Sequence, residues 1–303
     1  MTDMATSSPR VSRQSSMDVA PLKSQPRHRF GTVVGHCSKQ TDAGVRHWVQ
    51  VQNTQGELAW WPCPTKRPAL GAFLRMDTTT GNAHPLPDLL PEPILKALYR
   101  LCIHPEDLDQ LLWLMDGLQH AELQRFMLEI LQDPDIALPL VQQAASCRHH
   151  HSDPGGLLRH TVECTTWVQA WTSMLPPVEA DVTVVATLCH DIGKTQTITL
   201  SQTTTDTGQM VAHEIVGLQI LQPYLARLRR EWPQVADALL HMLSWHPNRR
   251  EPLPRLPGLV MLKHADQLST VMDLRHRAFE GYPPHHFWSK PHADQAQRFH
   301  RLG

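Results

Sequence analysis

The stretch Cys189-His190-Asp191-Ile192-Gly193-Lys194 is the most informative phrase of this 303-residue chain. It follows residues 182–188, which are apolar on nearly every face of a helix, so we predict a buried helix that ends at a histidine–aspartate pair. An imidazole and a carboxylate in a dry interior are costly unless they are paired or bind a metal. We expect Gly193 to take the left-handed conformation that ends a helix, which would bring Lys194 back over the pair. A single buried pair of this kind is more often a structural hydrogen bond, so its surroundings matter.

Two other phrases place a histidine and an aspartate on apolar helices. Residues 154–161 (PGGLLRHT) predict a helix that begins at a glycine pair and carries His160 near its buried side. Residues 262–268 (LKHADQL) place Asp266 among apolar neighbours on another helix, where a carboxylate needs a counter-charge. The chain holds 20 histidines, which fall in blocks on successive predicted helices rather than evenly.

The order His160, His190-Asp191, Asp266 resembles the HD-domain metal-dependent phosphohydrolases over about residues 145–275. The resemblance implies a helical bundle in which these four residues bind a divalent metal. Mn²⁺ is the expected ion, with Fe²⁺, Ni²⁺, Zn²⁺ or Mg²⁺ as alternatives. It also implies catalytic roles for Asp191, which would bridge two metals, and for Lys194, which would neutralise charge on a phosphate.

Further histidines could hold a second metal, as in some members of that superfamily. The chain offers His213 and His246 for this role. We favour His246 over His241 because Pro247 ends the predicted helix there, and the two histidines do not share one face of an unbroken helix. The alternative for His213 and His246 is a supporting or surface position.

The histidine triplet 149–151 precedes the glycine pair and is shared with two closer relatives. One is the YhaM-type 3′-5′ exoribonucleases, which also place an OB-like domain before the helices. The other is the TraI-type domain of MobH-class conjugative relaxases. From the resemblance we expect His150 and His151 to hydrogen-bond a phosphate or a metal ligand; the alternative is a polar loop before a helix.

The first part of the chain has the pattern of a small β domain. Short runs at 30–37, 47–52, 57–62 and 72–77 are β-type and are separated by turn signals, which is typical of an OB-fold. Residues that could stack on bases or bind phosphates are Trp48, Trp60, Trp61, Lys66, Arg67 and Arg75. The alternative is that the tryptophans make core or dimer contacts.

The predicted fold class is therefore a mainly α HD-domain helical bundle with a small N-terminal β (OB-like) domain. The expected segments are a disordered tail (1–29), the OB-like module (30–80), a linker (81–91), the helical bundle (92–280) and a C-terminal tail (281–303). Within the bundle we expect helices at 94–101, 105–116, 121–131, 157–174, 178–191, 213–230, 234–246 and 256–275. Residues 195–211 predict a polar loop or a small hairpin.

Composition adds limits to this interpretation. The net charge is −1, but the first 80 residues carry ten Lys and Arg against five Asp and Glu, whereas residues 81–303 carry 18 against 24. An excess of positive charge in the N-terminal part favours binding of a polyanion, although a net charge of five is also within ordinary variation. No apolar run approaches the roughly 18 residues that a membrane helix needs, so we expect no membrane partner. The six cysteines form no CxxC pair and are expected to be free thiols in a reducing cytoplasm.

The sequence thus predicts a metal-dependent phosphodiesterase that acts on single-stranded RNA or DNA, most simply a 3′-5′ exoribonuclease-like hydrolase. One alternative is a relaxase-related DNA-processing protein of a mobile element. Others are a nucleotide phosphohydrolase, and an interaction protein that keeps a metal without turnover. A homo-oligomer is compatible with all of these.

Overall fold

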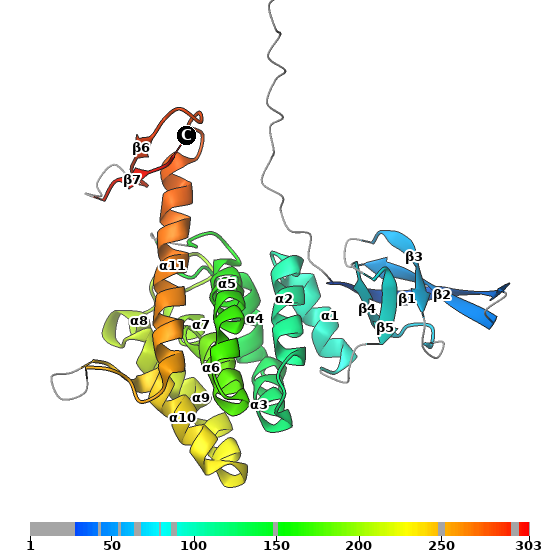
Figure 1. Ribbon diagram of the computed structural model, residues 1–303, viewed down its shortest axis with the longest axis horizontal. Coiled ribbons are helices and arrows are strands. Elements are labelled where there is room, and N and C mark those ends of the chain that lie inside the picture. The colour runs from blue at the N-terminus through cyan, green and yellow to red at the C-terminus, as the bar shows by residue number, and fades with distance from the viewer. Residues whose placement is uncertain are drawn as a thin grey trace, which may run out of the picture.

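The structure is a computed structural model that describes residues 28–41, 44–53, 56–63, 68–78, 80–85, 90–147, 151–247, 252–291 and 297–302. In this part of the chain a five-stranded sheet is followed by a body of helices and a short C-terminal strand pair (Figure 1). The tail predicted at 1–29 lies outside the described residues up to position 27, and His28 already begins the first strand.

The N-terminal sheet is antiparallel throughout and has the strand order β3-β2-β1-β4-β5. Its strands are β1 (His28–Thr41), β2 (Gly44–Asn53), β3 (Leu58–Cys63), β4 (Phe73–Asp77) and β5 (Asn82–Pro85). The edge strands β3 and β5 contact each other, so the sheet is curled. Its inner face buries Val33, Val49 and Val51. Strand β5 lies at the start of the segment expected to be a linker, because Asn82–Pro85 continues the sheet beside β4.

In the described part of the chain the helical body contains the eight predicted helices with small shifts at their ends, and three further helices that were not predicted, Pro134–Gln142, Lys194–Thr197 and Asp206–Met210. They are α1 (Glu92–Leu101), α2 (Pro105–Asp116), α3 (Ala121–Gln132), α4 (Pro134–Gln142), α5 (Gly156–Trp171), α6 (Pro177–Cys189), α7 (Lys194–Thr197), α8 (Asp206–Met210), α9 (His213–Glu231), α10 (Pro233–Ser244) and α11 (Pro257–Phe279). A single 3₁₀ turn, Thr172–Met174, follows α5.

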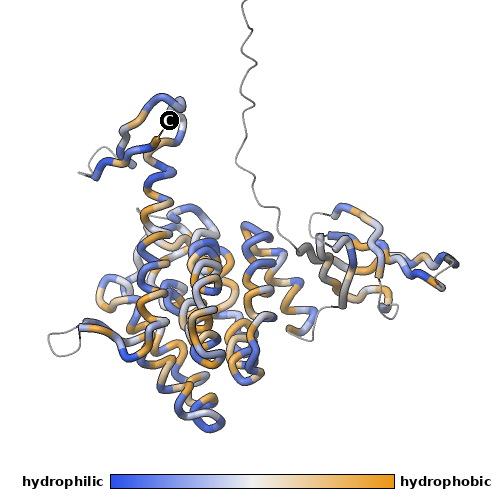
Figure 2. The backbone as a smooth tube through the Cα atoms, viewed as in Figure 1, coloured by the Kyte–Doolittle hydropathy of each residue, from blue (hydrophilic) through white to orange (hydrophobic). Residues whose placement is uncertain are grey.

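One core holds the helical body together. Apolar side chains of α1–α6 and α9–α11 form a single buried cluster. Orange and blue segments alternate along these helices in Figure 2, as expected when one face of each packs inward. Helix α6 is the exception predicted from its sequence: every residue from Asp181 to Cys189 is buried. This buried helix delivers His190 and Asp191 into the interior.

Two segments differ from the sequence-based expectation. The polar stretch 195–211 contains a single antiparallel bridge, Ile198 to Thr204, but it also forms the short helices α7 and α8. The C-terminal tail pairs β6 (Trp288–Ser289) with β7 (Phe299–His300) beyond the end of the long helix α11 (Figure 1). Strands of two residues carry too little period to be recognised in a sequence.

Two general expectations can be compared with the structure. All six cysteines are free thiols, as predicted. No helix in the described part of the chain is both long enough and apolar enough to span a bilayer.

Candidate metal centre

Three helices bring the predicted metal ligands to one point. His160 lies on α5, His190 directly follows α6, and Asp266 lies on α11. The Nε2 atom of His160 is 3.3 Å from His190 Nε2 and 3.3 Å from Asp266 Oδ1. One ligand atom from each of the three residues lies within 4.8 Å of the other two. The three phrases that stood out in the sequence therefore form one cluster in space.

The Nε2 atoms of the two imidazoles face each other. His190 Nδ1 lies 2.7 Å from the carbonyl oxygen of Thr187, which can only accept, so that nitrogen carries the proton. Ser269 donates its hydroxyl to Glu163, so the serine oxygen accepts from His160 Nδ1 at 2.9 Å. Each neutral ring thus presents a lone pair at Nε2. Two lone pairs 3.3 Å apart repel each other unless they share a cation.

Asp191 lies between two groups of side chains. Its Oδ2 atom is 2.6 Å from Lys194 Nζ, 3.4 Å from His160 Nε2 and 3.6 Å from His190 Nε2. Its Oδ1 atom is 3.1 Å from His213 Nε2, at the start of α9. A carboxylate whose two oxygen atoms face different partners has the geometry that a bridging ligand requires.

The electrostatics favour the ligating protonation states of His160, Asp191 and Asp266. Burial is the largest influence on His160 and lowers its pKa, although the nearby carboxylates of Asp266 and Asp191 act in the opposite direction, so the neutral ring is favoured. Burial alone would raise the pKa of Asp191, but Lys194 and the neighbouring histidines hold it well below its usual range. Burial likewise opposes ionisation of Asp266, but the nearby His160 and His190 together lower its pKa below the ordinary value.

The donor set fits a divalent metal. Neutral imidazole nitrogens and ionised carboxylates are the ligands that Mn²⁺, Fe²⁺ and Zn²⁺ share. His160, His190, Asp191 and Asp266 would hold the ion, and the facing lone pairs of the two imidazoles are the observation that calls for one.

A supporting group that the sequence analysis missed orients His160. Ser269, fully buried on α11, contacts His160 Nδ1, Glu163 and His151 at 2.9, 2.6 and 3.0 Å. His151 Nε2 also lies 3.2 Å from Glu163 Oε2. Burial opposes ionisation of Glu163, yet hydrogen bonds from His151 and Ser269 lower its pKa. Ser269 and Glu163 each lie one helical turn after a predicted ligand, Asp266 and His160, and this spacing is the signal that could have revealed them.

The remaining predicted histidines have different places. His151 is buried and reaches His160 through Ser269. His150 lies outside the described residues. Helix α10 ends at Ser244, and His246 beyond it is exposed, with its ring 3.1 Å from the Ser244 carbonyl oxygen. Within the described ranges His246 makes no recorded contact with the cluster, so the geometry favours His213 over His246 as a further ligand.

Gly193 does not take the left-handed conformation that we expected. Its φ is −62° and its ψ is −22°, which is ordinary helical geometry. A Cβ atom at this position would lie 1.8 Å from the His213 carbonyl oxygen. The glycine is therefore needed because the backbone of α9 passes against the turn, and this close approach places His213 beside Asp191. Lys194 still returns over the pair, because α7 begins at that residue.

The predicted nucleic-acid residues lie on or near the N-terminal sheet. Trp60 is 47% exposed and pairs with Gln50 on the outer face, whereas Trp61 packs against the core of the sheet. Trp48 is half-buried and shares the outer face with Trp60, by the alternation of side chains along β2 and β3. Lys66 and Arg67 lie outside the described residues, and Arg75 lies on β4.

The family comparison agrees with this geometry. Residues 157–271, which run from α5 to α11 and include all four predicted ligands, match the family described as HD domain. The chain carries an HD domain.

One curated relative is similar beyond that domain. The chain is 23% identical over 174 residues to the 3′-5′ exoribonuclease YhaM of Bacillus velezensis (strain DSM 23117 / BGSC 10A6 / LMG 26770 / FZB42), which covers 54% of this chain and 54% of the relative. The chain thus matches about half the length of that relative. No solved structure is significantly similar to the chain.

Proposed function

We propose that the HD domain is a metal-dependent phosphodiesterase that hydrolyses single-stranded nucleic acid, in the manner of a 3′-5′ exoribonuclease. The observation that carries the proposal is the pair of facing imidazole nitrogens beside two carboxylates. The similarity to a relative named as a 3′-5′ exoribonuclease supports a nucleic-acid substrate.

His160, His190, Asp191 and Asp266 would hold Mn²⁺ or a related ion. A divalent ion bound there supplies a Lewis acid that lowers the pKa of water and generates a nucleophile near neutral pH. In the overall hydrolysis a water oxygen forms the new bond to phosphorus, the ester P–O bond breaks, and the departing oxygen takes a proton. Both water protons are thereby accounted for, one on the departing hydroxyl and one released from the phosphate product.

The chain's own residues position and stabilise this reaction. Asp191 would act as the bridging metal ligand, because one of its oxygens faces His160 and His190 and the other faces His213. Lys194, whose side chain is mostly buried beside Asp191, supplies a fixed positive charge for the phosphate oxygens. Its distance of 2.6 Å from Asp191 also limits its position, so little reorganisation is needed when substrate binds.

In the same proposal the N-terminal sheet is an OB-like module that holds the strand. The exposed ring of Trp60 and the neighbouring Trp48 would stack on bases, and Lys66, Arg67 and Arg75 would contact phosphates. Trp61 has no part in this, because it packs inward.

The test is an assay with added Mn²⁺ on single-stranded RNA, single-stranded DNA and free nucleotides. We expect wild type to release nucleoside monophosphates from the 3′ end of RNA, and Asp191→Asn to lose at least 100-fold in kcat. Asp237→Asn on α10, which removes an exposed ion pair with Arg229 of α9, is the matched control and should keep wild-type activity.

Three results would contradict the proposal. Full activity in Asp191→Asn would place the chemistry elsewhere. Turnover of free nucleotides with none of a strand would favour the nucleotide phosphohydrolase. Cleavage confined to single-stranded DNA would favour the DNA-processing alternative.

A further inference from the structure

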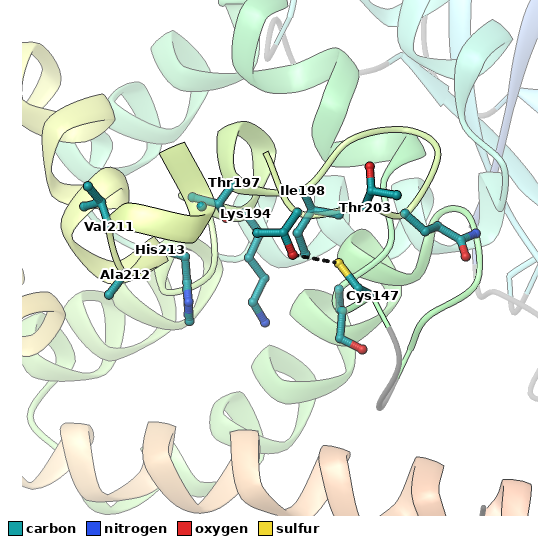
Figure 3. Close-up of a pocket in the computed structure, with 13 residues that line it drawn as sticks. Cys147, Lys194, Thr197, Ile198, Thr203, Val211, Ala212 and His213 are labelled. Carbon is teal, nitrogen blue, oxygen red and sulfur yellow. Dashed lines mark hydrogen bonds between the residues drawn. The ribbon is translucent and has the colours of Figure 1, made fainter. Parts of the chain in front are cut away.

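A pocket of about 620 Å³ lies directly beside the candidate metal centre (Figure 3). Two of its lining residues, Lys194 and His213, are the same residues that contact Asp191. In Figure 3 the side chains of Lys194 and His213 lie next to each other, with Lys194 between His213 on one side and Cys147 and Thr203 on the other. A group bound in this pocket is therefore adjacent to any phosphate held at the cluster.

The lining suits a neutral polar ligand joined to an anion. Thr197, Thr203, Thr204 and Ser146 contribute hydroxyl groups, and Gln202 contributes an amide. The apolar part comes from residues such as Ile198 and Val211. Among the lining residues that the structure describes there is no carboxylate, and Lys194 supplies a positive charge at the end near Asp191. A nucleoside offers the matching groups: hydroxyls and ring polar atoms for hydrogen bonds, and an apolar base face.

The loop that forms the pocket is held in place before any ligand binds. The buried amide of Gln143 donates to the carbonyl oxygens of Thr195 and Ile198, at 3.2 and 2.8 Å. Thr205 caps α8 through Gly208 and donates to the Gln196 carbonyl oxygen. Across the pocket, Thr204 Oγ1 lies 3.5 Å from Cys147 Sγ, which ties the loop to the segment before α5. A pre-formed wall lowers the ordering cost of binding.

We propose that this pocket is the nucleoside subsite of the enzyme, which holds the nucleoside attached to the phosphate that reacts at Lys194 and Asp191. The inference rests on the proposed phosphodiesterase function. The volume of the pocket falls within the roughly 300–1,000 Å³ of ordinary ligand pockets, so the pocket suits a single nucleotide rather than a length of strand. For a strand, the occupant is the terminal nucleotide that hydrolysis releases.

The test compares AMP with inorganic phosphate as ligands of the full chain in Mn²⁺, measured by calorimetry. Thr203 lines the pocket, so Thr203→Tyr adds a ring there while leaving Lys194 itself unchanged. Ser201→Tyr is the matched control, because it adds the same ring to an exposed position of the same loop outside the lining. We expect Thr203→Tyr to weaken AMP binding at least 10-fold and to leave phosphate binding unchanged, whereas Ser201→Tyr changes neither.

Steady-state kinetics provide a second measurement. Thr203→Tyr should raise the KM for the substrate that turns over, whether a single strand or a free nucleotide, and the substrate affected identifies the source of the nucleoside. Equal affinity of wild type for AMP and phosphate, or unchanged AMP binding in Thr203→Tyr, would overturn the subsite. Failure of the proposed function would look different: AMP would bind as described, yet no phosphodiester would be hydrolysed.

Discussion

The two ring nitrogens of His160 are committed to different partners. Nδ1 is directed to the hydroxyl of Ser269, which in turn donates to Glu163, so Nε2 is left to face His190 and Asp266. Supporting hydrogen bonds of this kind fix the tautomer and raise the basicity of a metal-binding imidazole. The ligand strength of His160 therefore depends on a serine that would not touch the metal.

Replacement of Ser269 by alanine tests this dependence. The change removes the acceptor for His160 Nδ1, and we expect metal affinity to fall roughly 10–100-fold. The measurement is a calorimetric titration with Mn²⁺, accompanied by a melting temperature to separate ligation from stability. Ser244→Ala removes a comparable hydroxyl at the exposed end of α10 and should leave the affinity unchanged. An unaltered affinity in Ser269→Ala would show that the orientation of His160 has another cause.

Single residues also show how far the sequence could be interpreted. The positions of His160, His190, Asp191 and Asp266 were predictable because each lies in a phrase with its own apolar surroundings. The role of Ser269 was missed, since its position one helical turn after Asp266 is only a weak signal until its partner on another helix is known. His246 stays a prediction, because a proline near a helix end marks the end and does not show which way the ring points.

At the scale of elements, the turn between α6 and α7 is fixed by the start of α9. A Cβ atom on Gly193 would lie 1.8 Å from the His213 carbonyl oxygen and 2.6 Å from the Gly217 nitrogen. From the sequence we expected this glycine to adopt a left-handed turn. A motif indicates which backbone conformations a residue prefers, but it does not show which distant segment of backbone packs beside that residue. At α4 a helix was missed, because the segment contains two prolines. Asp133 caps this helix, and Pro139 lies inside it.

Gly193→Ala should therefore cost stability rather than only shift a turn. The added methyl group meets backbone atoms that cannot rotate away, so we expect a loss of about 3 kcal/mol in the free energy of unfolding, with displacement of His213 from Asp191. Urea denaturation measures the loss. Gly117→Ala is the control, because its Cβ would be no closer than 3.4 Å to a neighbouring atom. Equal effects of the two changes would contradict the close approach of α9.

The packing of α1 on α2 gives a pH-dependent prediction. Tyr99 of α1 donates to Asp109 of α2 at 2.5 Å, and burial, reinforced by Asp109, raises the pKa of Tyr99 well above its ordinary value. A raised pKa in the folded state means that the stabilisation is complete below about pH 10 and is lost as the pH rises above it. Tyr224 adds to this loss, since burial and Asp133 raise its pKa to about 12.

Tyr99→Phe should flatten part of this alkaline loss of stability. Denaturant titrations at pH 8 and at pH 10.5 measure it: wild type should lose more of its unfolding free energy between the two than the variant does. At pH 8 the variant should be less stable by about 1–3 kcal/mol, because the buried carboxylate of Asp109 loses a donor. Identical pH slopes for both proteins would exclude Tyr99 as a source of the alkaline sensitivity.

At the scale of the whole molecule, the sheet and the helical body are in contact. Phe73 of β4 packs against the helical core, and its ring lies 5.7 Å from that of Tyr99 on α1. Strand β1 also contacts α2. The sheet was predictable from its alternation of apolar residues and its turn signals, but its attachment to the body was not, because single aromatic contacts leave no periodic trace in a sequence.

Under the proposed function, this arrangement should make strand binding separable from the chemistry at the cluster. Trp60 lies on the outer face of the sheet, and its indole should stack on a base of a bound strand. Loss of one stacked base costs about 1–3 kcal/mol, so Trp60→Ala should weaken binding of a single-stranded oligonucleotide roughly 5- to 150-fold. AMP binding at the pocket beside Lys194 should stay at its wild-type value, because the pocket is lined by residues of the helical body alone.

Fluorescence anisotropy with a labelled oligonucleotide measures the first effect, and calorimetry with AMP measures the second. Leu70→Ala is the matched control, because Leu70 is 64% exposed in the turn before β4 and is an aliphatic side chain rather than a stacking ring. Binding should also weaken with salt if basic residues of the N-terminal part contact the backbone. If Trp60→Ala binds the strand as tightly as Leu70→Ala and wild type do, the strand follows a path over the helical body, and the exposed tryptophan serves another contact.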